Sequence, residues 1–409
     1  MKKYTSLTFL SANIALIVLA SFCFFSCERN CAQKASVQEE IPIMAWWSIQ
    51  AADATLERYQ ELKDAGFNLT LTHTSKYEDG LKALDLAAAV GIKSVFSCKE
   101  LEDDPEATVN KVKNHPGLAG YFLKDEPVSS EFPALAEWAK KIMATDNEHF
   151  CYLNLFPNYV SEAALGESYQ SHVQRFVKEV GIQVLSFDFY PIVGDNQIRE
   201  RWYENLEVIA EESRKSGKPF WAFALSTAHN PYPIPTIAHL KVQMYSNLAY
   251  GAQYLQYFTY CSPDTSVWNF HEAPITHEKK RSQVYERVRA VNKELQSRAF
   301  VFMGAKPLFI RHTGASIPVG TKLLEQLPPQ VKSLDTNEDG AIVSLLEKEG
   351  FQYLVIVNKS IVKTLDLNIT FNGKTEVILK DGLIEDASKY SSWYRLDAGE
   401  AEIFRWKIL

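Results

Sequence analysis

Two adjacent carboxylates, Asp125 and Glu126, stand at the end of an apolar run and directly before Pro127. Two like charges this close raise the pKa of at least one of the two carboxyl groups, and a carboxyl group with a raised pKa can donate a proton near neutral pH. We therefore predict that Glu126 is a catalytic acid and that Asp125 assists it. The alternative is a solvated loop in which the pair caps the following helix.

Further candidates stand where other apolar runs stop. Asp188 is the third carboxylate that we predict to be catalytic, as a base or nucleophile opposite Glu126. The side chains that we predict to contact a substrate at such positions are polar or aromatic: Trp46, His73, Asn154, Tyr190, Tyr257 and Tyr260. Trp221, on the seventh run, is added as a candidate sugar platform together with Trp46. Ordinary core packing is the alternative for the rings. Because no histidine, cysteine or carboxylate cluster has metal-ligand spacing, we expect no metal and no cofactor.

The elements that must position these residues are short apolar runs, each followed by an amphipathic helical stretch. This alternation is typical of parallel βα units, and eight units in about 260 residues have the size of a closed (β/α)8 TIM barrel. The active site of such a barrel lies at the carboxyl ends of its strands, which would gather the candidates on one face. The eight runs cover residues 43–48, 68–73, 94–98, 119–123, 152–156, 184–190, 220–226 and 254–260. After the sixth run we expect a helix over residues 198–216.

The pattern changes after residue 298 to short alternating strands, as in residues 351–357 and 365–371, with turn signals at Asn372-Gly373 and Asp381-Gly382. We predict a small all-β sandwich domain there. The expected organisation is a signal peptide at 1–27, a tether at 28–40, a catalytic barrel at 41–298 and a β-sandwich at 299–409.

The first residues have the layout of an export signal, with Lys2 and Lys3 before an apolar stretch and Ser26-Cys27. A small residue before a cysteine resembles the bacterial lipoprotein processing box, in which that cysteine receives the lipid. The resemblance implies lipidation of Cys27 and a place in the cell envelope of a Gram-negative bacterium, on the outer or periplasmic face. We expect the membrane to be contacted only through this anchor.

The composition favours an uncharged substrate. The formal net charge of −7 argues against a polyanionic partner such as nucleic acid. The aromatic content of 12% suits sugar rings, whose apolar faces stack on aromatic side chains.

Three segments carry a resemblance to the glycoside hydrolases of clan A. Glu126 followed by Pro127 resembles their acid/base motif, residues 186–191 (SFDFYP) resemble their sixth strand, and residues 250–260 resemble their passage into the eighth strand. The resemblance implies a catalytic barrel with a C-terminal β-domain. Two positions differ from the family pattern: Asp125 replaces the usual asparagine, and residues 218–226 (KPFWAFALS), which form the predicted seventh strand, contain no nucleophile carboxylate.

Three explanations remain open for the second catalytic group. Asp188 acts with Glu126, and the separation of the two carboxyl groups decides between retention and inversion. Alternatively, Asp125 and Glu126 act as in substrate-assisted N-acetylhexosaminidases, with Tyr190 or Tyr257 supporting the acetamido group. In the third explanation, the barrel binds carbohydrate without cleaving it. Our prediction is a glycoside hydrolase with a carbohydrate substrate, and with partners from a glycan-uptake system.

Overall fold

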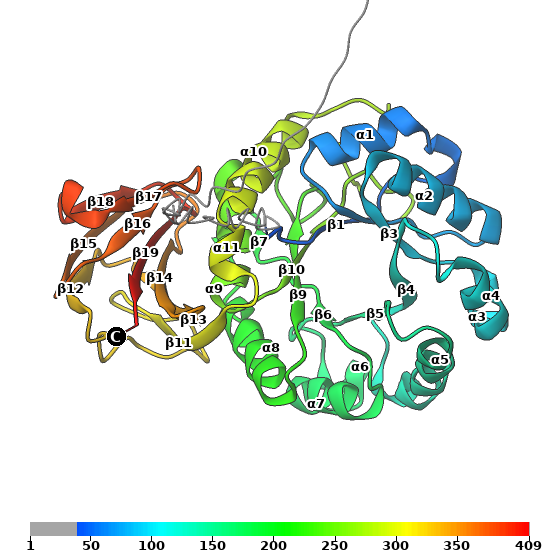
Figure 1. The fold of residues 1–409 in the computed structure, drawn as a ribbon, viewed down its shortest axis with the longest axis horizontal. Helices are drawn as coiled ribbons and strands as arrows, with labels where there is room; N and C mark the ends of the chain where they lie inside the picture. The colour runs from blue at the N-terminus through cyan, green and yellow to red at the C-terminus, as the bar shows by residue number, and fades with distance from the viewer. Residues whose placement is uncertain (1–38, 409) are drawn as a thin grey trace, which may run out of the picture. The chain divides into compact units, whose positions relative to one another are not determined.

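The computed structural model describes residues 39–408, and Figure 1 shows eight parallel strands closed into a barrel within them. The strands follow one another around the barrel in chain order, and β10 closes it against β1. All eight predicted runs therefore form barrel strands. The signal peptide, Cys27 and most of the predicted tether lie outside the described residues. The barrel strands are β1 (Ile43–Trp46), β2 (Leu69–Leu71), β3 (Lys93–Phe96), β4 (Leu118–Asp125), β5 (Phe150–Leu155), β6 (Leu185–Phe187), β9 (Phe220–Leu225) and β10 (Tyr254–Phe258).

Helices cover the outside of the barrel and return the chain between strands (Figure 1). Their ends follow local sequence signals. Ser282 caps the last long helix by accepting a hydrogen bond from the Val284 amide, and Gly91 ends the second at a φ of +74°, which glycine adopts without a steric penalty. The main helices are α1 (Leu56–Asp64), α2 (Tyr77–Val90), α4 (Pro105–Val112), α5 (Phe132–Thr145), α7 (Tyr169–Glu179), α8 (Trp202–Ser216), α9 (Ile237–Ala249) and α10 (Gln283–Ser297). Three shorter helices are α3 (Lys99–Asp103), α6 (Glu162–Leu165) and α11 (Ala299–Phe302).

One helix begins later than the sequence pattern indicates. Residues expected at the start of the helix over 198–216 instead finish a small hairpin of β7 (Ile192–Val193) and β8 (Gln197–Ile198), and α8 begins at Trp202. Gly194, at a φ of +52°, donates its amide to the Pro231 carbonyl at 2.8 Å. This contact holds the hairpin against the loop that follows β9.

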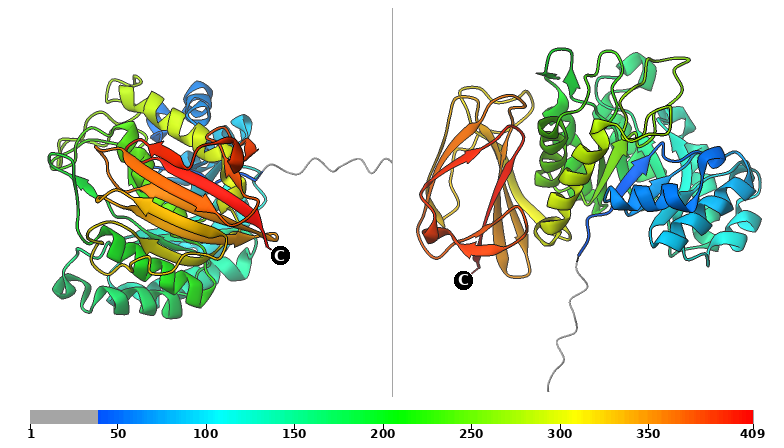
Figure 2. Two further views of the ribbon diagram at one scale, coloured as in Figure 1. Left: turned by 90° about the vertical axis from the view of Figure 1, so that its left-hand side faces the viewer. Right: turned by 90° about the horizontal axis from the view of Figure 1, so that it is seen from above.

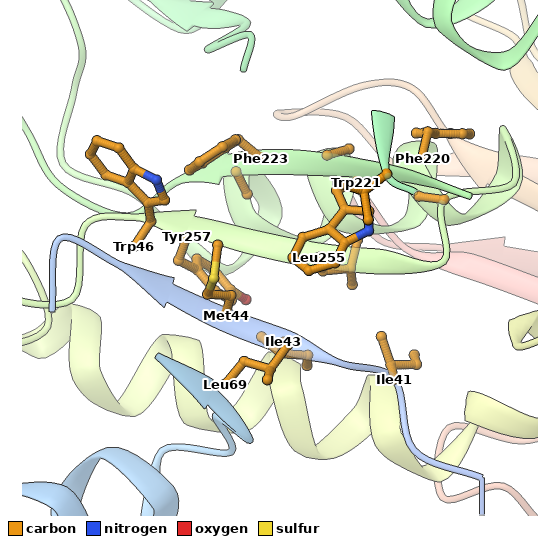
Figure 3. Close-up of a cluster of buried hydrophobic side chains, with 14 of the residues drawn as sticks. Ile41, Ile43, Met44, Trp46, Leu69, Phe220, Trp221, Phe223, Leu255 and Tyr257 are labelled. Atoms are coloured by element: carbon orange, nitrogen blue, oxygen red, sulfur yellow. The ribbon is translucent and has the colours of Figure 1, made fainter. Parts of the chain in front are cut away.

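Large side chains fill the interior of the barrel in successive layers (Figure 3). Trp46 and Phe223 lie near the carboxyl ends of β1 and β9, whereas Trp221 lies nearer the start of β9. Trp221 is fully buried and stacks on Tyr254 with ring centroids 3.9 Å apart. The lower layers are therefore closed by packed rings, and the barrel is open to a ligand only at the carboxyl ends of its strands.

The remaining strands form a β-sandwich, as predicted. Figure 2 shows its two sheets facing each other. One face of the larger sheet packs on the smaller sheet, while residues such as Ile342, Val355 and Ile403 on the other face join the hydrophobic core of the barrel. The larger sheet contains β11 (Lys306–His312), β13 (Ala341–Lys348), β14 (Phe351–Asn358), β19 (Ala401–Lys407), β16 (Glu376–Ile378) and β17 (Ile384–Asp386); the smaller contains β12 (Val331–Thr336), β15 (Leu365–Phe371) and β18 (Trp393–Leu396).

Candidate active site

A cavity of about 360 Å³ opens at the carboxyl ends of the barrel strands. Strand ends supply one part of its wall and the loops after β5, β6, β9 and β10 supply the other. The lining residues are Trp46, Asp125, Glu126, Asn154, Tyr159, Asp188, Tyr190, Arg199, Phe223, His229, Asn230, Pro231, Tyr232, Phe258, Trp268 and Phe270. This is the position at which barrel enzymes place their active sites.

Glu126 is held in an unusual backbone conformation at the end of β4. Its φ is +46°, in the left-handed region that residues other than glycine rarely adopt. The Glu126 amide donates to the carbonyl of Asn154 on β5 at 2.8 Å, and Pro127, which has no amide hydrogen, cannot continue the ladder. Strain of this kind concentrates at functional sites, where surrounding contacts maintain it.

The three carboxyl groups of the cavity all have raised pKa values. Burial and the neighbouring charge of Asp125 raise the pKa of Glu126 to about 7, against the opposing effect of a hydrogen bond with Asp188. Burial raises the pKa of Asp125 to about 6, against a hydrogen bond from Asn154. The pKa of Asp188 is raised well above its usual range by burial and by the charges of Glu126 and Asp125.

Glu126 and Asp188 form a pair. Both side chains line the same cavity, and the charge of Glu126 raises the pKa of Asp188, so the two groups can hold one proton between them over a broad pH range. Hydrogen bonding from Tyr190 and Asn154 acts in the opposite direction, since it lowers the pKa of Asp188 and favours its ionised form. The Oδ1 atom of Asp188 is buried without a protein partner among the described residues. The pair can therefore present an acid on Glu126 and an uncommitted oxygen on Asp188.

A chain of hydrogen bonds beneath the cavity connects three strands to Asp125. Asn154 donates to Asp125 at 3.2 Å and accepts from Ser186 at 2.9 Å. Ser186 in turn accepts from Gln256 at 2.9 Å, and Gln256 accepts from Tyr152 at 2.5 Å. Because buried polar groups that are fully paired fix one arrangement, this chain orients the Asn154 amide toward the carboxylates.

The structure brings six of the ten residues predicted for the site together in the cavity wall. They are Asp125, Glu126, Asp188, Trp46, Asn154 and Tyr190. His73 lies behind them: its ring is 4.6 Å from those of both Trp46 and Phe122, and burial lowers its pKa to about 4, which keeps the ring neutral. His73 therefore supports Trp46 and does not line the cavity.

Three further residues that we predicted to contact the substrate do not line the cavity. Trp221 faces the barrel interior but lies one layer below Phe223 (Figure 3), so the cavity does not reach it. Side chains alternate along a strand, and Tyr257 therefore points outward, where its hydroxyl donates to Asn292 of α10 at 2.9 Å. Tyr260 is also buried on the outer side, with its ring 5.4 Å from that of Phe67.

Loop residues that the strand-end rule does not select complete the wall. Tyr159, Arg199 and Tyr232 come from the interiors of the loops after β5, β6 and β9. Trp268, in the loop after β10, is 53% exposed at the cavity wall. The sequence indicates Trp268 as a candidate for the mouth of the barrel, because it lies in the loop after the eighth strand, but it does not specify that Tyr159, Arg199 and Tyr232 converge there.

The seventh barrel strand contributes no acid to the site. Phe223 is the only residue of β9 in the cavity wall, and the following loop supplies His229, Asn230, Pro231 and Tyr232. The structure thus agrees with the departure from the clan A pattern that the sequence shows.

Within residues 39–408, no three histidine, cysteine or carboxylate side chains are arranged to hold a metal ion. None of the helices in that range is both long enough and apolar enough to cross a membrane.

Comparison with known proteins connects this architecture to glycoside hydrolases. The family described as beta-galactosidase, glycoside hydrolase family 42, matches residues 140–298. A glycoside hydrolase family 5 structure from Bacteroides vulgatus aligns with a TM-score of 0.56 at 12% identity, over 90% of this chain and 89% of that one. A family 39 glycoside hydrolase from Bacteroides cellulosilyticus aligns with a TM-score of 0.50 at 10% identity, over 90% and 81% of the two chains.

A beta-galactosidase from Marinomonas aligns with a TM-score of 0.49 at 9% identity, over 63% of this chain. The chain spans about 60% of the length of that enzyme. No curated protein matches the sequence. At these identities the structural matches establish the fold, and together with the family match they show that the chain is a glycoside hydrolase-like (β/α)8 barrel followed by a β-sandwich.

Proposed function

We propose that this protein hydrolyses a glycosidic bond, with Glu126 as general acid and base and Asp188 as nucleophile. The observation that supports this most is that both carboxyl groups line one open cavity at the carboxyl ends of the strands, where the charge of Glu126 raises the pKa of Asp188. A sugar-binding site needs no carboxyl group with a raised pKa, whereas an acid catalyst does, and three such groups surround this cavity.

The closeness of the pair supports retention of anomeric configuration. An inverting enzyme holds a water molecule between the sugar and its base, which requires carboxyl groups about 6.5–9.5 Å apart, whereas a retaining enzyme holds them about 5–5.5 Å apart. We assign Glu126 and Asp188 to the shorter separation, because the charge of Glu126 raises the pKa of Asp188.

The reaction proceeds in two displacements. Asp188 attacks the anomeric carbon while Glu126 protonates the glycosidic oxygen, so the bond to the leaving sugar breaks and that sugar departs as an alcohol. Glu126, now a carboxylate, removes a proton from water, and this water displaces Asp188 from the anomeric carbon. Both carboxyl groups return to their starting forms.

Aromatic rings supply the platform for the sugar. Trp46, Phe223, Phe258 and Phe270 line the cavity around the carboxylates, and Trp268 stands exposed at its wall. The apolar faces of a pyranose stack on such rings. Phe223 therefore lines the cavity in place of Trp221, which we predicted to contact the substrate.

A panel of aryl glycosides with purified protein tests the proposal. The wild-type protein should cleave at least one of them, and proton NMR should show that the first product keeps the anomeric configuration of the substrate. Asp188→Asn should lower kcat by a factor of about 10³ or more, whereas Asp195→Asn, a control on the exposed β7–β8 hairpin, should not.

Two results would exclude Asp188 as the nucleophile. If Asp125→Asn is the more damaging change, and only on N-acetylated sugars, the acetamido group of the substrate is the nucleophile. If the first product has the opposite configuration, water attacks directly. Cleavage of no glycan at all would leave carbohydrate binding as the function.

A further inference from the structure

An arginine without an acidic partner lies in the wall of the candidate active site. The Nη2 atom of Arg199 donates to the hydroxyl of Tyr232 at 3.1 Å, and this is the only hydrogen bond that its side chain makes among residues 39–408. No carboxylate of the described chain lies within 4 Å of it, in contrast to Arg201, which pairs with Glu204 at 2.6 Å. A guanidinium has five N–H groups, so Arg199 keeps most of its donors uncommitted.

The arginine is held in place by its surroundings. Its guanidinium lies over the ring of Tyr159, 4.5 Å from the centroid, and 5.4 Å from that of Tyr232. Its backbone amide donates to the Pro191 carbonyl at 2.7 Å, directly after the β7–β8 hairpin. Contacts with aromatic rings favour a fixed cation, and they leave the N–H edges of the guanidinium free to bind a ligand.

Tyr232 adds a donor beside the guanidinium. Its hydroxyl oxygen accepts from Arg199 at 3.1 Å, and within residues 39–408 its own O–H group makes no hydrogen bond as a donor. The hydrogen of the Tyr232 hydroxyl therefore remains available to a ligand. Guanidinium and hydroxyl donors side by side match the oxygen atoms of a carboxylate or a sulfate ester.

The catalytic carboxyl groups do not prevent an anion from entering. Because burial and mutual repulsion raise the pKa values of Glu126 and Asp188, the pair retains a proton near neutral pH, and the cavity then carries less negative charge than three free carboxylates would. The net charge of −7 of the whole chain argues against a polyanion bound along the surface, but it does not govern a single anionic group beside Arg199.

We propose that the preferred substrate carries an anionic substituent, a carboxylate or a sulfate ester, on the sugar bound in this cavity, and that Arg199 and Tyr232 bind that substituent. This inference rests on the proposed glycosidase function for its substrate class. We expected an uncharged substrate from the composition. The inference replaces this with an anionic substrate, whose selection depends on the positive charge of Arg199.

Matched aryl glycosides test the inference: a neutral hexoside, the corresponding uronide and the corresponding 6-O-sulfate. The wild-type protein should have a higher kcat/KM for one of the two anionic substrates than for the neutral one. In Arg199→Gln, the ratio of anionic to neutral kcat/KM should fall roughly ten- to a hundredfold, mainly through KM, because charge-assisted hydrogen bonds are lost. Tyr232→Phe should lower the same ratio by less.

Arg201→Gln is the matched control, since it removes an exposed arginine two positions away. It should leave the ratio unchanged. A preference for the uronide assigns a planar carboxylate to the site, and a preference for the sulfate assigns the ester. Equal loss on all three substrates in Arg199→Gln, or a wild-type preference for the neutral one, would overturn the inference.

Binding to Glu126→Gln separates this inference from the proposed function. Calorimetry with the free uronic acid, the sulfated sugar and the neutral sugar needs no turnover. If nothing is cleaved but an anionic sugar binds more tightly than the neutral one, and Arg199→Gln abolishes the difference, the glycosidase proposal fails while the anion site stands. If the glycosides are cleaved and the three sugars bind equally, only the anion site fails.

Discussion

Glu126 combines two features that oppose stability. A left-handed backbone conformation is unfavourable for a residue with a Cβ atom by roughly 1–2 kcal/mol, and burial disfavours its ionised carboxylate. Neither feature is needed to close the barrel, because a glycine or an uncharged residue would meet the same backbone requirement. The residue therefore fits a chemical role better than a structural one.

The free energy of unfolding should fall as the pH rises from 4.5 to about 7, because in this range Glu126 is ionised in the unfolded chain but still protonated in the folded protein. Its pKa is about 7 when folded against an ordinary value of 4.5, so between these values the folded protein holds a proton that the unfolded chain has lost. Glu126→Gln removes this dependence. Its melting temperature relative to wild type should therefore be more favourable at pH 8 than at pH 5.

Thermal melts of both proteins at the two pH values provide the measurement. Glu137→Gln, on the exposed face of α5, is the control and should track the wild type. If the difference in melting temperature between Glu126→Gln and wild type is the same at both pH values, the folded state does not raise the pKa of Glu126.

At the scale of the elements, the strands were predictable and the loops were not. Runs such as residues 220–226 are buried on both faces of a parallel barrel, so hydrophobicity alone marks them. The outward orientation of Tyr257 depends on register, which places Gln256 and Phe258 inside, and an uninterrupted apolar run contains no alternation to reveal it. Arg199 reaches the site through a hairpin of two-residue strands, which is too short for periodicity to detect.

In the candidate site, the residues at the strand ends were predictable, and the contacts between them were not. Asp125, Glu126, Asn154 and Asp188 directly end or follow apolar runs, and the carboxyl ends of parallel strands converge whatever the loops do. The convergence of Glu126 and Asp188 on one cavity depends on side-chain direction at two separate strands, which a strand-end rule cannot give. The hydrogen-bond chain through Ser186 was likewise not visible in the sequence.

Ser186→Ala should disturb both stability and catalysis, because it breaks the chain between β5, β6 and β10. The Gln256 amide and the Asn154 carbonyl oxygen would lose a partner in a buried position, at a cost of about 1–3 kcal/mol. The freed Asn154 would orient Asp125 less well, so kcat should fall as well. Urea unfolding and kinetics on one aryl glycoside measure the two effects.

Ser94→Ala on β3 is the matched control. Ser94 is equally buried, but its hydroxyl contacts only the neighbouring Val95 carbonyl, at 3.4 Å. It should leave kcat unchanged. Equal effects of the two substitutions would mean that the chain through Ser186 does not support the site.

At the scale of the whole molecule, one buried arginine connects the barrel to the sandwich. Arg298 is 1% exposed and donates to the carbonyls of Leu379, Ile378 and Ala401 at 3.0–3.1 Å. It also donates to Tyr245 of α9 at 3.0 Å. These bonds, with the shared hydrophobic core, couple the folding of the two parts.

Arg298→Met should destabilise the protein by about 3–5 kcal/mol, since three buried carbonyls lose their donor. It should also weaken the coupling, so that calorimetry resolves two unfolding transitions in place of one. Arg395→Met, which removes an exposed partner of Asp366, is the control. A single transition with an unchanged midpoint would contradict the coupling.

We propose that a lipid on Cys27 anchors the protein in the cell envelope; this residue lies outside the described part of the chain. Cys27→Ser should move the protein from the membrane to the soluble fraction of expressing cells, because the thiol that would carry the lipid is missing. Cys23→Ser should not. Membrane fractionation followed by immunoblotting measures this, and a Cys27→Ser protein that stays in the membrane fraction would exclude the anchor.

The most direct test of the central claim is the dependence of Glu126→Gln on the leaving group. A general acid contributes about 10²- to 10⁴-fold to the rate when the departing oxygen needs a proton. In Glu126→Gln, kcat/KM should therefore fall by that factor on an unactivated glycan, and by much less on the dinitrophenyl glycoside of the same sugar, whose leaving group departs without protonation. Equal losses on both substrates, or no loss on the glycan, would contradict the assignment of Glu126 as the acid.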